Sequence, residues 1–181
     1  SYMYIEENDL PAVQKIITKM QQQASKIDSP LIDFVINSTQ IEYYLMKYNS
    51  FRLSNEKNEL NLISDSISFH CKKMIYLYEN TADKNNKLVW ESGLINAYMN
   101  LASAEAMRTD PDWDKVLQSI EKVESFNIPP NNNLAYLQYL HRKNLAYSEQ
   151  GKYQLSIKGL LELLEILDYS VEHSSTDQGH R

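Results

Sequence analysis

His70 and Cys71 are adjacent in the sequence, and a histidine beside a cysteine is the pairing of a base with a nucleophile. Adjacent side chains on a helix diverge by about 100°, however, so these two cannot hydrogen-bond as a catalytic pair. Cys71 also falls on an apolar stripe with Ile67 and Met74, where a free cysteine packs as a small hydrophobe. We therefore interpret the pair as part of a helix core and not as a catalytic dyad.

The metal-binding patterns in the chain are incomplete. Asp110, Asp112 and Asp114 occupy positions 1, 3 and 5 of a calcium loop, with Glu121 at position 12. Position 6 requires glycine but is Lys115, and acidic residues are favoured at a helix start in any case. The histidines lack zinc-ligand spacing, and a single cysteine allows no Cys-based zinc site. We predict no metal, no cofactor and no enzymatic activity.

The amino-acid composition indicates which fold class to expect and which kinds of partner are excluded. The 181 residues include only 4 Gly and 5 Pro, which favours long helices over many short strands. A net charge of −6 without a basic cluster argues against direct nucleic-acid binding. No run of apolar residues is long enough to span a membrane. The single cysteine favours a cytoplasmic location, although a periplasmic sensor segment has a similar composition.

Apolar residues recur at spacings of three and four, which is the periodicity of one helix face. The pattern predicts helices at about 10–27, 31–53, 57–80, 88–108, 111–125, 132–149 and 152–168. The stripe of the first helix ends at Ile27, and that of the third runs through Ile63, Ile67, Cys71 and Met74. The stripe of the last helix consists of Tyr153, Ile157, Leu160, Leu161, Leu164 and Leu167.

Capping and breaking residues set the expected boundaries. Asp9 and Pro11 suit the start of the first helix, and Asp110 with Pro111 suits the start of the fifth. We expect one helical domain over 10–169, preceded by an extension or cloning residues at 1–9 and followed by a polar tail or linker at 170–181. Because the chain starts at Ser1 and not at Met, we expect it to be a segment of a longer protein.

Tight turns and longer loops alternate along the chain, which groups the helices into hairpins. Turns near 54–56, 109–110 and 150–151 would join the helices of each hairpin, and loops at 82–87 and 127–131 would connect successive hairpins. The hairpins would then cover 31–80, 88–125 and 132–168. A helix hairpin cannot bury its apolar faces alone, so stacked hairpins are expected to share a continuous core.

The last hairpin resembles the tetratricopeptide-repeat motif. The resemblance rests on Ala146-Tyr147, on the turn Gln150-Gly151-Lys152-Tyr153, on Ser156-Ile157 and on the apolar run 160–166. It implies an all-α, right-handed α-solenoid of about three hairpins; the alternative is an irregular helical bundle. The sequence departs from the motif at Asn144, at Ser156 and in repeats longer than 34 residues.

The resemblance also implies which residues would face a binding groove. On the sixth helix they are Gln138, His141, Arg142, Leu145, Ser148 and Glu149; on the fourth they are Tyr98, Leu101, Glu105 and Arg108. The two arginines matter most, because an arginine can bind a carboxylate through two hydrogen bonds. The alternative is that these are ordinary solvated or inter-helix positions. Five tyrosines are expected in the core or between helices, namely Tyr44, Tyr48, Tyr78, Tyr147 and Tyr153.

The leading functional hypothesis is a non-catalytic module that binds a protein or peptide, with self-association as one form of that binding. The alternative is a ligand- or partner-sensing input segment of a larger transcription regulator or sensor kinase. Both rest on the resemblance, because tetratricopeptide-like proteins serve both uses.

Overall fold

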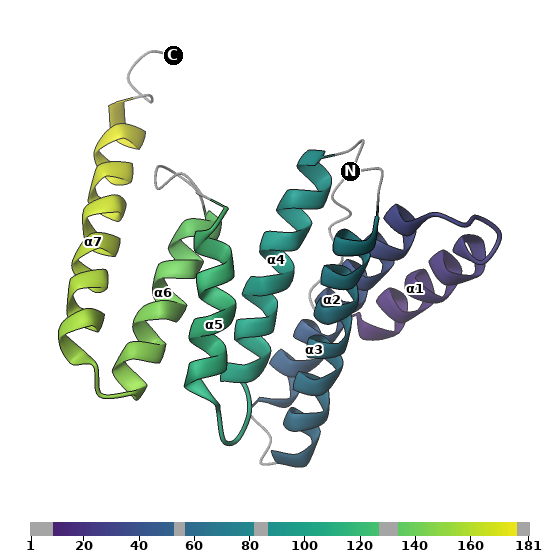
Figure 1. Cartoon of the computed structure of the whole chain (residues 1–181), viewed down its shortest axis with the longest axis horizontal. Coiled ribbons are helices and arrows are strands. Elements are labelled where there is room, and N and C mark those ends of the chain that lie inside the picture. The colour runs from purple at the N-terminus through teal and green to yellow at the C-terminus, as the bar shows by residue number, and fades with distance from the viewer. Residues whose placement is uncertain (1–8, 53–56, 82–86, 127–133, 177–181) are drawn as a thin grey trace. The chain divides into compact units, whose positions relative to one another are not determined.

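The computed structural model describes residues 9–52, 57–81, 87–126 and 134–176 (Figure 1). Within these ranges the chain is all-α, with seven helices that pack mostly on their neighbours in sequence. They belong to two compact units, Ser1–Pro111 (unit 1) and Asp112–Arg181 (unit 2). The predicted connections at 54–56, 82–86 and 127–131 lie outside the described residues. The single domain expected over 10–169 stays a prediction.

Unit 1 contains four helices: α1 (Leu10–Ala24), α2 (Pro30–Phe51), α3 (Lys57–Asn80) and α4 (Lys87–Ala106). The α2 helix packs on α1 and α3, and α3 also packs on α4. Buried residues of α2, α3 and α4 make one core, namely Phe34, Ile41, Ile63, Ile67, Cys71, Met74, Trp90, Ala97 and Ala104. Tyr44, Tyr48 and Tyr78 pack against this core, as predicted. The stripe predicted for the third helix, through Ile63, Ile67, Cys71 and Met74, is therefore confirmed as part of the core.

The α1 helix begins where the sequence predicts and ends earlier. The Asp9 side chain accepts a hydrogen bond from the Ala12 amide at 3.0 Å, and proline occupies the first turn. At the other end the α-helical hydrogen-bond pattern is replaced by a tighter turn, in which the Ile27 amide bonds to the Ala24 carbonyl three residues earlier. Ile27 lies beyond the helix and is 55% exposed, so its prediction as the last residue of the apolar stripe is wrong.

Unit 2 contains α5 (Trp113–Glu124), α6 (Leu134–Glu149) and α7 (Tyr153–Thr176), and α6 packs on both of the others. Val116, Ile120 and Val123 are fully buried, and their spacing of four and three is the apolar periodicity of the helix predicted at 111–125. The predicted cap is wrong by two residues: Asp112, not Asp110, accepts the hydrogen bond of the first turn, from the Lys115 amide at 3.2 Å. Extended backbone at Asp112 suits an N-cap residue.

The α7 helix also extends beyond its predicted end. The sequence places a helix over 152–168 and a polar tail from 170, whereas α7 continues to Thr176. Residues 169–176 are mostly polar but contain no glycine or proline, so nothing in the backbone stops the helix there. The polar composition of this segment therefore predicts the end of the helix less well than the position of the next glycine or proline does.

The turn between α6 and α7 is the one that the sequence predicts at Gly151. The Lys152 amide bonds to the Tyr147 carbonyl at 2.8 Å, and the Gly151 amide bonds to the Ser148 carbonyl at 3.0 Å. These two bonds define a Schellman motif, which requires a left-handed residue after the helix. Gly151 meets this requirement, with φ of 73°. The turn therefore fixes where α6 ends and where α7 begins.

We expect Gly151→Ala to lower the free energy of unfolding of unit 2 by about 1 kcal/mol, because alanine is strained in the left-handed region. A methyl group at this position meets no other atom within 4 Å, so the effect should come from the backbone alone. Chemical denaturation measures it. Gly151→Asn should cost less, since asparagine adopts this conformation more readily. Equal losses for the two variants would contradict this explanation.

Candidate partner-binding site on α6 and α7

The residues predicted on the sixth helix share one face of α6. Gln138, His141, Leu145 and Glu149 are all exposed, and their spacing of three and four places them along one side. Arg142 is half-buried at the edge of this face. The structure therefore brings the predicted α6 residues together on one surface, although their binding role stays a prediction.

A second surface runs along α7 and consists of large apolar side chains. They are between 40% and 64% exposed and comprise Tyr153, Ile157, Leu160, Leu161, Leu164 and Leu167. Their spacing places them on one side of the helix. We call this set the α7 stripe. Periodicity predicted the stripe itself, but the expectation that Tyr153 is a core or inter-helix residue is wrong.

The α7 helix packs on α6 through a different face, which includes two small residues, Ser156 and Gly159. Ser156 is buried, and its Oγ donates a hydrogen bond to the Asn144 carbonyl at 3.0 Å. Gly159 lies directly against the Asn144 side chain, because a Cβ built on it would be 2.8 Å from Asn144 Cγ. Small residues let two helices approach closely. The two departures from the repeat motif, Asn144 and Ser156, thus form part of this contact.

A hydrogen bond at the other end of the same interface holds α7 on α6. The Tyr136 hydroxyl donates to Glu162 Oε1 at 2.6 Å. Burial and the neighbouring carboxylate together raise the pKa of Tyr136 to about 12, so the phenol keeps its proton at neutral pH. The α7 stripe is therefore presented by a helix that is fixed along its opposite side.

A cavity of about 250 Å³ lies beside the α6 face and the α7 stripe. It is lined by Leu137, Gln138, His141, Arg142, Leu163 and Leu167. Arg142 forms no hydrogen bond or ion pair with any residue whose side chain the structure describes. Burial lowers the pKa of its guanidinium group below the ordinary value, although the group stays charged at neutral pH. The cavity thus combines apolar walls with one available cation.

The residues predicted on the fourth helix are placed in unit 1, where Arg108 already has partners. Its guanidinium group pairs with Asp65 of α3 and, at 3.1 Å, with Glu105 one turn earlier on α4. Burial raises the pKa of Tyr98, and the charge of Glu79 adds to this effect. Tyr98, Glu105 and Arg108 are therefore engaged within unit 1, and a partner that binds Arg108 would have to compete with Asp65 and Glu105.

The His70–Cys71 pair and the calcium-like pattern make the following contacts in the described residues. His70 Nδ1 lies 2.8 Å from Asn37 Oδ1, and Cys71 is fully buried, with burial raising the pKa of its thiol to about 12. Asp114 of the calcium-like pattern accepts a hydrogen bond from Gln150 at 2.7 Å. No group of three or more potential metal ligands occurs among the described residues, and none of their helices is long and apolar enough to cross a membrane.

Comparison with known proteins assigns no family. No model of a protein family, no curated protein and no solved structure matches this chain. The structure itself shows an all-helical protein whose helices pack in sequence order. The function must therefore be inferred from the surfaces described above.

Proposed function

We propose that this chain is a non-catalytic, tetratricopeptide-like binding module that holds a protein or peptide partner on α6 and α7. The α7 stripe carries the proposal. Six large apolar residues at roughly 100 Å² each would expose about 600 Å², which is the upper range for an apolar patch on a monomer. Patches of this size commonly mark interaction sites. The glycine turn into α7 and the sequential helix packing support the repeat-like architecture.

The chemistry of the surface favours an amphipathic partner helix or peptide. Apolar partner residues at helical spacing would cover the α7 stripe, in the way that helices dock into apolar grooves. Arg142, beside the stripe, would bind an acidic side chain or a terminal carboxylate of the partner. The exposed side chains Lys158 and Glu165 flank the stripe on one edge. Lys158 would pair with an acidic side chain of the partner, and Glu165 would pair with a basic one.

A second copy of the chain satisfies part of this description. Two α7 helices could pair in antiparallel orientation around a two-fold axis. The edge of one α7 stripe would then lie against the same edge of the other stripe, with the two helices running in opposite directions. Lys158 of one copy would then face Glu165 of the other, while Leu160 and Leu161 lie near the axis. The estimated area is somewhat below the 800 Å² per partner that is typical of stable interfaces. We therefore expect self-association to be weak.

A selection of displayed peptides tests the proposal. The library is panned on the wild-type chain and counter-selected on the double variant Leu161→Gln, Leu164→Gln. We expect recovered peptides to carry apolar residues at spacings of three and four, with an acidic group near one end. Arg142→Glu should weaken their binding at least about tenfold, since it replaces the cation with a like charge. If no peptide distinguishes the wild-type chain from the double variant, the α7 stripe is not the binding surface.

The variants are designed to leave the fold unchanged. Leu161 and Leu164 are 56% and 54% exposed, and substitutions at such surface positions usually change stability by less than about 0.5 kcal/mol. Leu155 offers a matched control, because it is 49% exposed but lies on another side of α7. Leu155→Gln should bind peptides like the wild-type chain. Light scattering over a range of protein concentrations shows whether a second copy occupies the stripe.

A sensing role is the second candidate function, as the input segment of a larger transcription regulator or sensor kinase. A polar pocket in unit 1, between α1, α2 and α3, favours this candidate. Ligand sensing and partner binding are compatible in one chain, because a ligand that stabilises one state shifts the population that binds the partner.

A further inference from the structure

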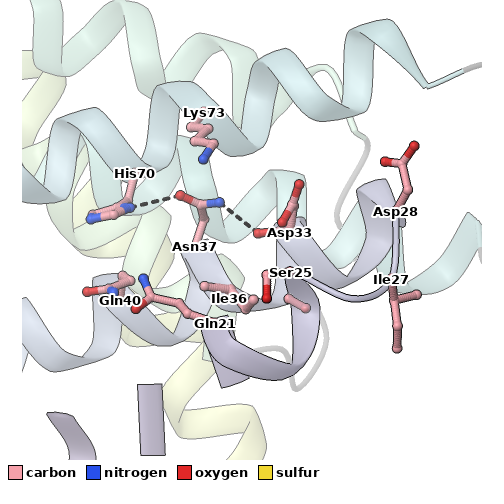
Figure 2. Close-up of a pocket in the computed structure, with 11 residues that line it drawn as sticks. Gln21, Ser25, Ile27, Asp28, Asp33, Ile36, Asn37, Gln40, His70 and Lys73 are labelled. Carbon is pink, nitrogen blue, oxygen red and sulfur yellow. Dashed lines mark hydrogen bonds between the residues drawn. The ribbon is translucent and has the colours of Figure 1, made fainter. Parts of the chain in front are cut away.

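The polar pocket of unit 1 has a volume of about 420 Å³, within the range of pockets that hold small molecules (Figure 2). Polar side chains from three helices line it: Gln21 of α1, Asp33, Asn37 and Gln40 of α2, and His70 and Lys73 of α3. In Figure 2, His70 and Asn37 lie on one side of the pocket, and Gln40 and Gln21 lie on the other. The members of this group come from three separate helices, so their spacing in the sequence does not reveal that they lie together.

Gln40 contributes a side-chain amide to the pocket that has no partner in the described part of the protein. Its side chain is only 8% exposed. The amide atoms themselves are not fully buried, because they open into the pocket. Because Gln40 lines the pocket, a water molecule or a ligand there can supply the missing bonds.

Asn37 and His70 are held in a defined hydrogen-bonding arrangement. Asn37 Nδ2 donates to the Asp33 carbonyl at 2.7 Å, which fixes the orientation of the amide. Asn37 Oδ1 can only accept, so the hydrogen in its 2.8 Å contact with His70 must reside on Nδ1. Burial, and secondarily the charge of Lys73, lower the pKa of His70, so the ring is neutral at pH 7. Nε2 of His70 is then a hydrogen-bond acceptor without a partner among the described residues.

Charges of both signs border the same pocket without neutralising one another. Lys73 supplies a cation, and Asp28 and Asp33 supply carboxylates. None of the three forms an ion pair with another residue that the structure describes. A ligand with separated charges could therefore interact with both signs. The volume of about 420 Å³ suits a molecule of up to about 14 non-hydrogen atoms, at roughly 30 Å³ for each atom or bound water.

We propose that this pocket binds a small zwitterion of the free amino-acid class. The carboxylate of the ligand pairs with Lys73, its amino group pairs with Asp28 or Asp33, and the Gln40 amide bonds to its polar atoms. The binding energy would come from charge-assisted hydrogen bonds to Lys73 and an aspartate, which are exposed, and from hydrogen bonds to the largely buried Gln40. This proposal is independent of the α7 stripe, because all of the pocket residues belong to unit 1.

Thermal unfolding in the presence of each of the twenty free L-amino acids, at about 10 mM, tests the proposal. Trp90 lies in the core of unit 1, so its fluorescence in a Trp113→Phe background reports on that unit. We expect a small subset of the amino acids to raise Tm by about 3 °C or more, because a ligand that binds only the folded state stabilises it. Calorimetric titration then gives Kd for the best of them. If no amino acid shifts Tm or produces binding heat, the proposal is wrong.

Variants of the glutamines identify the site. Gln40→Leu should weaken binding at least about tenfold with little change in Tm, since it removes an amide that has no partner among the described residues and replaces it with a side chain of similar size. Gln21 also lines the pocket but is exposed, so Gln21→Ala tests ligand binding without changing the packing of the core. Gln23→Ala, exposed and outside the pocket, should bind like the wild-type chain. Unchanged binding by both Gln40→Leu and Gln21→Ala would overturn the assignment.

The double variant Leu161→Gln, Leu164→Gln separates this proposal from the proposed partner binding. It should bind the amino acid with wild-type Kd, because it changes only unit 2. Loss of peptide binding together with unchanged amino-acid binding supports two separate sites. Loss of amino-acid binding in this variant would contradict the placement of the ligand in the unit 1 pocket.

Discussion

Gly159→Ala is expected to lower the free energy of unfolding of unit 2 by about 2 kcal/mol, the cost of inserting a methyl group into a well-packed contact. A Cβ at this position would lie 2.8 Å from Asn144 Cγ and 2.9 Å from Asn144 Nδ2. Asn144 is only 3% exposed, so its short side chain has little room to move. Hydrogen exchange of the α6 and α7 backbone measures the effect and should accelerate by about 30-fold where protection reflects unfolding of the unit.

Asn144→Ala provides the control for this steric explanation. Asn144 Nδ2 is buried without a hydrogen-bond partner among the described residues, so removing the amide should cost little on its own. In the double variant Asn144→Ala, Gly159→Ala the added methyl group occupies the space that the amide vacates. We expect stability close to that of Asn144→Ala alone, and therefore a large coupling energy between the two sites. Additive losses would contradict the proposed clash.

Gly93→Ala is expected to destabilise unit 1 by about 1–3 kcal/mol, for a related reason in a larger core. A Cβ on Gly93 would lie 2.6 Å from Cζ of Phe34. The Phe34 ring is buried and packs against Trp90, with 4.6 Å between the ring centroids, so it cannot retreat without disturbing Trp90. Alanine stabilises an exposed helix relative to glycine by about 1 kcal/mol, so a net loss would show that the clash outweighs helix propensity. Denaturation followed by Trp90 fluorescence measures the loss.

Two further variants separate the Gly93 clash from other effects of the substitution. Phe34→Leu, Gly93→Ala should be more stable than the sum of the two single changes predicts, because leucine leaves space for the methyl group. Asn96→Ala, at an exposed position of α4, should change stability by less than about 0.5 kcal/mol. A Gly93→Ala variant as stable as the wild-type chain would show that α2 and α4 do not approach as closely as the structure indicates.

The number and approximate position of the helices could be predicted from the sequence, because spacings of three and four depend only on helix geometry. The buried stripe of α3 and the glycine turn at Gly151 are direct outcomes of that reasoning. The cap at Asp112 and the end of α7 at Thr176 could not be fixed in the same way. Two nearby aspartates suit an N-cap equally well, and polar residues without glycine or proline do not end a helix.

Periodicity also could not show which apolar face has a neighbour. The α7 helix has two faces that could pack: the large side chains of the α7 stripe and the smaller set around Ser156 and Gly159. The second face packs on α6, because Gly159 lets the Asn144 side chain approach closely. The sequence carries this signal only as a pair of departures from a repeat motif, at Asn144 and Ser156. In the structure these two positions are in contact across the α6–α7 interface.

The candidate site was predicted in part. The α6 positions share an exposed face, as the repeat geometry implied, and Arg142 lacks a partner among the described side chains. Arg108, chosen by the same reasoning, pairs with Asp65. Asp65 belongs to α3, a different helix, and nothing in the local sequence of α4 indicates that these residues meet. Contacts between helices decided which arginine remains available.

The affinity of one selected peptide for the wild-type chain and for the double variant Leu161→Gln, Leu164→Gln tests the proposed binding role most directly. Each leucine is about half exposed, so its burial by a partner should contribute roughly 1 kcal/mol or more. We therefore expect the double variant to raise Kd by about 30-fold or more, with Tm unchanged and with Leu155→Gln binding like the wild-type chain. Equal Kd values for the wild-type chain and the double variant would contradict binding on the α7 stripe.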